Sequence, residues 1–184
     1  MIKKKSLALN KKLTNEFNLL LSKIKLKNNI FVHRDFHVSN LMKVKKQIGI
    51  LDSQDALFGN KAYDLASLID DVRLKTSFSL KNSIYNYYVQ TNKKQINENY
   101  FRNDFEILSV LRNLKIIGIF TRLAIRDNKK KYLKLIPYAW KLIENRINNN
   151  VIFADLKNYL DDNFSTTVFE GAGPIVFVKT PHIS

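Results

Sequence analysis

The spacing of apolar residues predicts a few short strands set among helices. Residues 11–26 place apolar side chains every three or four positions, which predicts one amphipathic helix. The short apolar run at 28–33 predicts a strand. Residues 41–44 and 48–52 predict two more strands, and the polar turn at 45–47 between them makes a β-hairpin the expected arrangement.

From about Ala62 onward the pattern becomes helical. The longest of these segments is apolar on most sides around Ile116, so we expect it at the centre of a helical bundle. Pro137 is expected within or near the start of a helix. The predicted helical segments are 61–74, 79–90, 99–128, 130–147 and 153–164. Together with the hairpin, they predict an α+β fold that is mostly α-helical.

The composition is that of a folded cytoplasmic protein. The chain has 184 residues, of which 45% are hydrophobic, enough for one domain with a real core. It has no cysteine, which excludes disulfides and thiolate metal sites and fits a reducing compartment. The N-terminus lacks the apolar run of a signal peptide. The longest apolar stretch, 114–125, is interrupted by charged residues and falls short of the roughly 20 residues that span a bilayer, so no membrane partner is expected.

The net charge of +15 changes this picture little. Its lysines are spread along the whole chain, which is typical of a solvated surface rather than a nucleic-acid site, so we expect no specific nucleic-acid partner. Residues 164–184 differ in composition, with glycine, proline and β-type residues in place of lysine. The predicted organisation is therefore a domain over residues 1–163 and an atypical tail over 164–184.

Candidate chemistry is concentrated in residues 31–42, FVHRDFHVSNLM. In an extended segment His33, Asp35 and His37 would share one face, and two imidazoles with a carboxylate are a plausible zinc or iron set. That alternative leaves Asn40 and the later Asp52 without a role.

A catalytic loop explains more of these residues. His33, Arg34 and Asp35 followed by four residues and Asn40 have the spacing of a kinase catalytic loop. Phosphoryl transfer needs a carboxylate beside the attacking hydroxyl, for which Asp35 is suited. It also needs hard oxygen ligands for magnesium, for which Asn40 and Asp52 are suited.

These motifs resemble a known superfamily. Residues 32–42, followed by 49–71, are similar to the aminoglycoside phosphotransferase and choline kinase superfamily of small-molecule kinases. Residues 111–147 resemble the bacterial cell-wall sugar kinases, which phosphorylate N-acetylmuramate and N-acetylglucosamine at the anomeric hydroxyl in peptidoglycan recycling. The resemblance covers about residues 10–163. It implies the C-terminal lobe of a protein-kinase-like fold, with the hairpin carrying the catalytic loop, and ATP- and Mg²⁺-dependent phosphorylation of a sugar.

The resemblance also assigns roles by position. It makes Asp35 the catalytic base, Asn40 and Asp52 the ligands of the nucleotide-bound Mg²⁺, and His33 a residue that holds the loop. Asp64 matches a helix aspartate that braces the loop through its backbone. This agrees with the preference for an acidic residue in the first turn of a helix.

Other polar residues are candidates for contact with the substrate. His37 and Ser39 lie in the loop itself. Arg112, Asn113 and Lys115 interrupt the most apolar helix, where they either mark its exposed edge or line a pocket for the sugar or phosphate.

The sequence departs from the family in two places. Ser53 follows Asp52 where an aromatic residue is usual, which would loosen the local packing. No glycine precedes Gly49, so the glycine-rich loop of an N-terminal lobe is missing before Asp35. We therefore expect a C-terminal lobe only, which a split gene, a decayed fragment or a reused binding module would each explain. A split gene would place the N-terminal lobe in a separate partner chain, and the chain alone is expected to phosphorylate little.

Two alternative functions are left open by the sequence. A non-catalytic interaction module would bind through the basic surface, with a steep dependence on salt. Aminoglycoside phosphorylation would need an acidic pocket for a cationic substrate. The basic excess disfavours it unless Asp70 and Asp71 form a local acidic patch.

Overall fold

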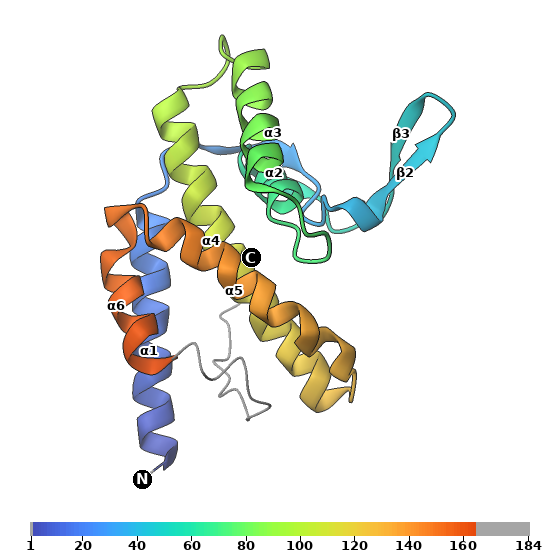
Figure 1. The fold of residues 1–184 in the computed structure, drawn as a ribbon. Coiled ribbons are helices and arrows are strands. Elements are labelled where there is room, and N and C mark those ends of the chain that lie inside the picture. The colour runs from blue at the N-terminus through green and yellow to red at the C-terminus, as the bar shows by residue number, and fades with distance from the viewer. Residues whose placement is uncertain (1, 165–184) are drawn as a thin grey trace. The chain divides into compact units, whose positions relative to one another are not determined.

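The computed structural model describes residues 2–164 of the chain, with side chains from residue 11 onward. The described part is mostly helical and contains two small antiparallel sheets (Figure 1). The helices are α1 (Ile2–Ser22), α2 (Tyr63–Ile69), α3 (Phe78–Thr91), α4 (Glu98–Arg126), α5 (Ile136–Ile147) and α6 (Ala154–Asn163). The strands are β1 (Asn28–Val32), β2 (Leu41–Val44), β3 (Gln47–Ile50) and β4 (Leu57–Asn60), and the 3₁₀ turns are η1 (Val38–Asn40), η2 (Lys130–Leu135) and η3 (Val151–Phe153).

The described residues divide into two compact units. One unit contains residues up to Lys23 together with those from Val110 onward, and the other contains Ile24–Ser109. Helix α4 contributes to both. The predicted tail lies, from residue 165 onward, outside the described residues. None of the described helices is long and apolar enough to cross a membrane.

Within the described residues, every regular element of the first unit is helical. Helices α1 and α5 both contact α6, and Pro137 occupies the first turn of α5, where its missing N–H costs no hydrogen bond. Its buried apolar side chains follow the helical spacing and include Leu13, Leu20, Ile116, Phe120, Ile143 and Leu160.

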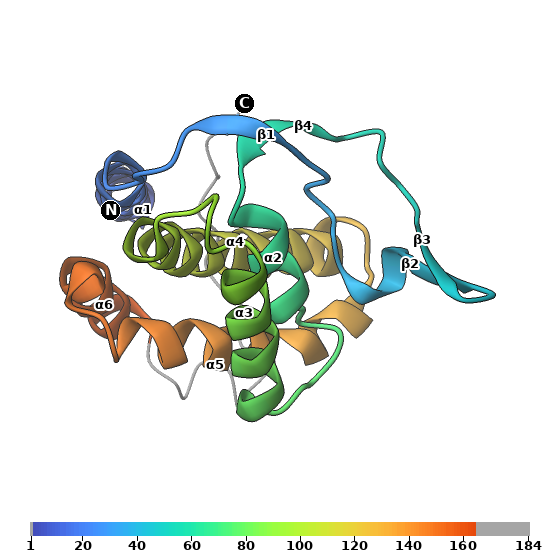
Figure 2. The ribbon, with the colours of Figure 1, turned by 90° about the horizontal axis from the view of Figure 1, so that it is seen from above.

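The second unit places two two-stranded sheets beside a helical core. Strand β1 pairs with β4, and β2 pairs with β3 in the predicted hairpin. Figures 1 and 2 both show the β2–β3 hairpin projecting away from α2 and α3. Seven buried residues of α2, α3 and α4 and their flanks form the core: Ala62, Leu65, Ala66, Ile69, Val89, Phe101 and Phe105.

Two helices have other boundaries than the sequence predicted, and one strand was not predicted. The helix predicted over 11–26 begins earlier, at Ile2, and ends earlier, at Ser22. It ends there because the Asp104 carboxylate accepts hydrogen bonds from the amides of Lys25 and Leu26, which keeps these two residues out of the helix. The helix predicted over 61–74 ends at Ile69. Strand β4 was not predicted, because four residues form it only by pairing with the distant β1.

Candidate active site

The candidate catalytic loop connects the end of β1 to β2. Its first residues are held by Asp64 in the first turn of α2. The Asp64 carboxylate accepts hydrogen bonds from the backbone N–H groups of His33, at 2.7 Å, and Arg34, at 3.0 Å. Arg34 has a φ of 74°, a conformation that costs a non-glycine residue about 1–3 kcal/mol and persists where its surroundings enforce it. The two hydrogen bonds to Asp64 supply such enforcement.

Within the loop, the side chain of Asn40 is hydrogen-bonded to the backbone of Asp35. The side-chain Nδ2 of Asn40 donates to the carbonyl oxygen of Asp35 at 2.9 Å. The N–H of His37 donates to the same carbonyl at 3.0 Å, and the N–H of Asn40 donates to the His37 carbonyl at 2.9 Å. The loop is thus closed on itself, and the Asp35 side chain is exposed to solvent.

The segment after β3 is connected to this loop. The N–H of Leu51 donates to the Asn40 carbonyl at 2.9 Å, and the ring Nε2 of His33 lies 2.9 Å from the Leu51 carbonyl oxygen. A carbonyl oxygen only accepts, so this contact places a proton on Nε2 of His33. Asp52 follows directly, exposed and with a φ of 68°. Hydrogen bonds therefore link the backbone segments that carry His33, Asp35, Asn40, Asp52 and Asp64.

The donor set suits a hard divalent cation. Because Nδ2 of Asn40 is engaged with Asp35, its Oδ1 remains as a carbonyl ligand, and Asp52 offers an exposed carboxylate. Oxygen ligands of this kind are those that Mg²⁺ prefers. The alternative site of His33, Asp35 and His37 is not formed: among the side chains described, those of residues 11–164, no three His, Asp or Glu are grouped to hold a metal ion.

The residues proposed to face the substrate differ in burial. His37 is buried, at 7% exposure, whereas Ser39 is exposed. The interpretation of Arg112 and Asn113 as an exposed helix edge is wrong, because they are 6% and 1% exposed. Both belong to the unit that begins again at Val110, whereas the loop belongs to the other unit. A role in substrate binding stays a prediction for all four.

Asp70 and Asp71 do not form an acidic surface patch. Each is only 2% exposed. Asp70 accepts from the Ser109 hydroxyl and pairs with the buried ammonium of Lys81 at 3.4 Å. Asp71 accepts from backbone and side-chain N–H groups, one of which belongs to the loop. The acidic patch that an aminoglycoside would require is therefore absent at these positions.

Sequence reasoning missed the structural role of Asp71. The sequence carried no local signal for it, because α2 ends at Ile69 and Asp71 lies in the segment that follows, two residues beyond the helix. Asp104 was also missed, although an aspartate in a strongly apolar helix indicates a buried hydrogen-bonding role.

Electrostatics connect Asp64 to the helical core. Burial of the Tyr88 phenol raises its pKa above the ordinary value of 10.0, and the negative charge of Asp64 raises it further. Both effects disfavour the phenolate. Tyr88 therefore reports on the charge of the carboxylate that holds the loop.

Comparison with known proteins gives consistent matches. Residues 4–102, more than half of the chain, match the phosphotransferase enzyme family. A protein of Neisseria meningitidis named N-acetylmuramate/N-acetylglucosamine kinase is 40% identical over 114 residues, which are 59% of this chain and 34% of that protein. Kinases of the same name from Caulobacter vibrioides and Pseudomonas putida are 31% and 30% identical, over 68% and 75% of this chain and 34% and 42% of their own length. The chain thus spans well under half the length of these curated relatives.

Proposed function

The chain belongs to the phosphotransferase enzyme family, and on that premise we propose that it carries the catalytic loop for ATP- and Mg²⁺-dependent phosphorylation of an amino sugar. N-acetylmuramate and N-acetylglucosamine are the proposed substrates, because the relatives carry these names. The observation that carries the proposal is the loop geometry: the backbone of Asp35 is bonded to Asn40, and Asn40 is bonded to the segment that presents Asp52.

In this proposal Asp35 is the general base. Its exposed carboxylate accepts the proton of the sugar hydroxyl as that oxygen attacks the γ-phosphorus of ATP, and ADP leaves. Asn40 Oδ1 and Asp52 would hold Mg²⁺, which neutralises charge on the phosphates when bound. His33 and Asp64 maintain the loop conformation through their hydrogen bonds.

We further propose that a nucleotide-binding lobe, formed by residues other than those described, covers the β2–β3 hairpin. Four apolar side chains of this hairpin are 45–62% exposed: Met42, Val44, Ile48 and Ile50. The hairpin begins directly after Asn40, where the phosphates of the nucleotide would be. The share of 34–42% that the chain spans of its relatives supports the need for such a component. Turnover by the chain alone is expected to be slow.

The experiment tests binding and transfer separately with the full chain. Binding of each sugar is measured by calorimetry, and transfer of ³²P from Mg-ATP is measured with the same preparations. We expect Asp35→Asn to bind the sugar as the wild type does but to transfer at least about 100-fold more slowly, the usual contribution of a general base. Asp55→Asn is the matched control, because Asp55 is an exposed aspartate of the neighbouring segment.

Three results would count against the proposal. Transfer that survives Asp35→Asn would remove Asp35 from the mechanism. Rapid turnover by the chain alone would remove the need for a nucleotide-binding partner. Absence of sugar binding, together with binding to a polyanion that falls steeply with salt and survives Asp35→Asn, would favour a basic interaction module instead.

A further inference from the structure

The candidate loop is held by a second carboxylate, at its other end. While Asp64 binds the amides of His33 and Arg34, the Oδ2 of Asp71 accepts a hydrogen bond from the N–H of Val38 at 3.2 Å. Val38 begins the short turn η1, which ends at Asn40. Asp64 lies in the first turn of α2 and Asp71 two residues after its end, so α2 and the segment that follows it contact the loop on both sides of Asp35.

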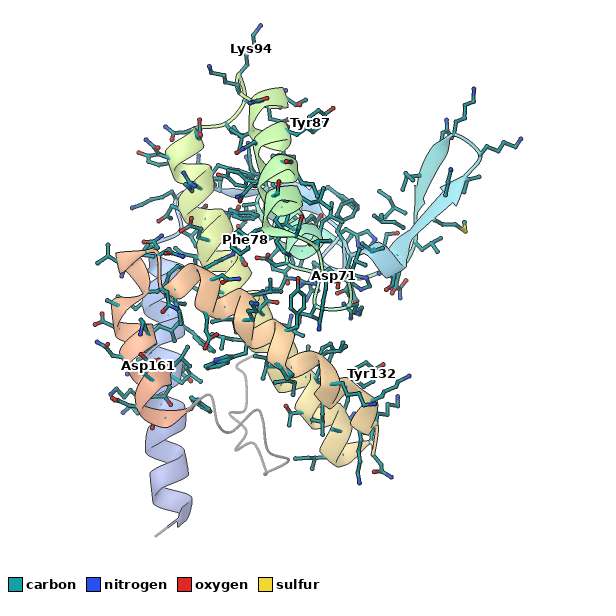
Figure 3. All side chains as sticks on the ribbon, viewed as in Figure 1. Asp71, Phe78, Tyr87, Lys94, Tyr132 and Asp161 are labelled. Atoms are coloured by element: carbon teal, nitrogen blue, oxygen red, sulfur yellow. The ribbon has the colours of Figure 1, made fainter. Side chains whose placement is uncertain are left out.

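Asp71 is buried and hydrogen-bonded on both of its carboxylate oxygens. Its side chain is 2% exposed. Its second oxygen, Oδ1, accepts from the backbone N–H of Arg73 at 3.0 Å and lies 3.5 Å from the Arg73 guanidinium. Hydrogen bonds from N–H groups to an ionised carboxylate are stronger than those to a neutral acceptor. Asp71, which is labelled in Figure 3, is therefore a buried acceptor for the loop amide of Val38.

The neighbouring Asp70 fixes the position of Asp71 relative to the core. Its carboxylate bonds to Lys81 of α3 and to Ser109 of α4, and the Lys81 ammonium also donates to the carbonyl oxygen of Ile69. All of these groups are buried. The C-terminal end of α2 is thus attached to two other helices, which gives Asp71 a rigid base.

We propose that Asp71 is a positioning residue for the loop. This proposal rests on the proposed function, because Asp71 would act through Asp35 and Asn40. The amide of Val38 belongs to the same turn as Asn40, and the Asn40 side chain donates to the carbonyl oxygen of Asp35. Release of Val38 from Asp71 displaces this turn and loosens the link between Asn40 and Asp35. The contacts of His33 and Arg34 with Asp64 do not depend on it.

The test compares Asp71→Ala and Asp71→Asn in the ¹⁵N-labelled full chain by NMR. In Asp71→Ala we expect hydrogen exchange of the Val38 amide to accelerate by about tenfold or more, the loss of one charged hydrogen bond. The side-chain amide signals of Asn40 shift, while exchange at His33 and Arg34 is unchanged. Asp71→Asn retains one carbonyl acceptor and restores most of the protection.

The matched control is Asp161→Ala, which removes an exposed aspartate of α6. Among the described residues, Asp161 forms an ion pair with Lys157 and none with the loop. Unchanged exchange at Val38 in a folded Asp71→Ala protein would overturn the proposal. Equal acceleration at Val38, His33 and Arg34 would also overturn it, because that pattern indicates general loosening. If Asp71→Ala fails to fold, Asp71→Leu, which also removes both oxygen acceptors but keeps more of the side-chain volume, decides on the same two criteria.

Kinetics then separate positioning from binding. Where the wild type transfers phosphate, Asp71→Ala is expected to lower kcat by about tenfold or more and to leave the KM for the sugar within about twofold, since it acts on the loop conformation. A raised KM with unchanged kcat would contradict positioning. A wild type without any turnover would count against the proposed function, whereas the amide exchange measurements still decide the role of Asp71.

Discussion

The candidate loop and the helical core of the same unit are held in place by different interactions. The core depends on apolar packing: Phe101 stacks on Tyr88 with ring centroids 5.3 Å apart, and Phe105 lies against Tyr85 at 4.9 Å. The loop depends on hydrogen bonds from its backbone to the carboxylates of Asp64 and Asp71. Chemistry and stability are therefore separable in this unit, because the loop keeps Asp35 exposed and none of its apolar side chains is fully buried.

The β2–β3 hairpin extends this comparison. None of its residues is buried, and apolar side chains occupy both of its faces. Leu41 and Ile50 pair on one face, while Met42, opposite Gly49, lies on the other. An isolated two-stranded hairpin is marginally stable in water. The stability of the hairpin should thus depend on the loop and on any partner that covers the hairpin, whereas the stability of the core should not depend on the hairpin.

The largest effect is expected in the core. Phe101→Ala removes a fully buried ring, with 0% exposure, and should lower the free energy of unfolding by about 3–5 kcal/mol. Urea denaturation followed by circular dichroism measures this change. Tyr87→Ala is the matched control, because Tyr87 on α3 is 73% exposed and points outward in Figure 3. A loss of stability below 1 kcal/mol for Phe101→Ala would refute the packed aromatic core.

A buried carboxylate should come second. Asp104 is 0% exposed and accepts from the amides of Lys25 and Leu26, both at 2.8 Å, and from the Asn60 side chain at 2.7 Å. Asp104→Ala leaves these donors unsatisfied and should cost about 2–3 kcal/mol. Asp104→Asn, which keeps one acceptor, should cost less. Equal denaturation midpoints for the wild type and Asp104→Ala would show that water replaces the carboxylate without loss.

Asp64→Asn tests the contact between loop and core. It removes the charge but keeps one acceptor, and should cost about 1 kcal/mol. It should also lower the pKa of Tyr88, because the nearby negative charge is one of the two causes that raise it. The pKa of Tyr88 is measured by NMR of the ring carbons in tyrosine-labelled protein. An unchanged Tyr88 pKa in Asp64→Asn would show that burial alone raises it.

The same tyrosine gives a pH dependence of stability. Since the Tyr88 pKa is higher in the folded chain than its ordinary value, its contribution to stability is fully present below about pH 10 and is lost as the pH rises through the raised value. Tyr88→Phe should remove this alkaline loss. Denaturation midpoints measured on both sides of pH 10 compare the two proteins, and identical alkaline profiles would exclude Tyr88 as the cause.

Local spacing predicted the parts of the site that are close in sequence. The order of His33, Asp35 and Asn40 is contained in eight residues, and the hairpin follows at once. The parts that failed depend on distant partners. Strand β4 exists because Leu57 pairs with Val32, and the end of α1 is set by Asp104, 79 residues after Lys25. No local pattern carries such information, because each residue's surroundings are supplied by another part of the chain.

The burial of charged residues was equally hard to predict. Arg112 reads locally as the edge of an apolar helix, and Asp71 as one half of an acidic patch. Both are buried in the structure. A charge is usually exposed unless partners offset its desolvation, and those partners come from other elements. For Asp71 they are the Val38 amide and Arg73.

The smallest effect is expected at the hairpin. Ile48 on β3 is 62% exposed, so Ile48→Ala should change the free energy of unfolding of the chain by less than about 0.5 kcal/mol. Ile69→Val is the comparison in the core: Ile69 is 3% exposed, and loss of one buried methyl group should cost about 1 kcal/mol. Urea denaturation of both variants shows at which of the two sites the substitution lowers the free energy of unfolding more. A loss of more than 1 kcal/mol in the free energy of unfolding for Ile48→Ala would mean that other residues of this chain already cover the hairpin. The proposed nucleotide-binding lobe would then have no free apolar surface to bind there.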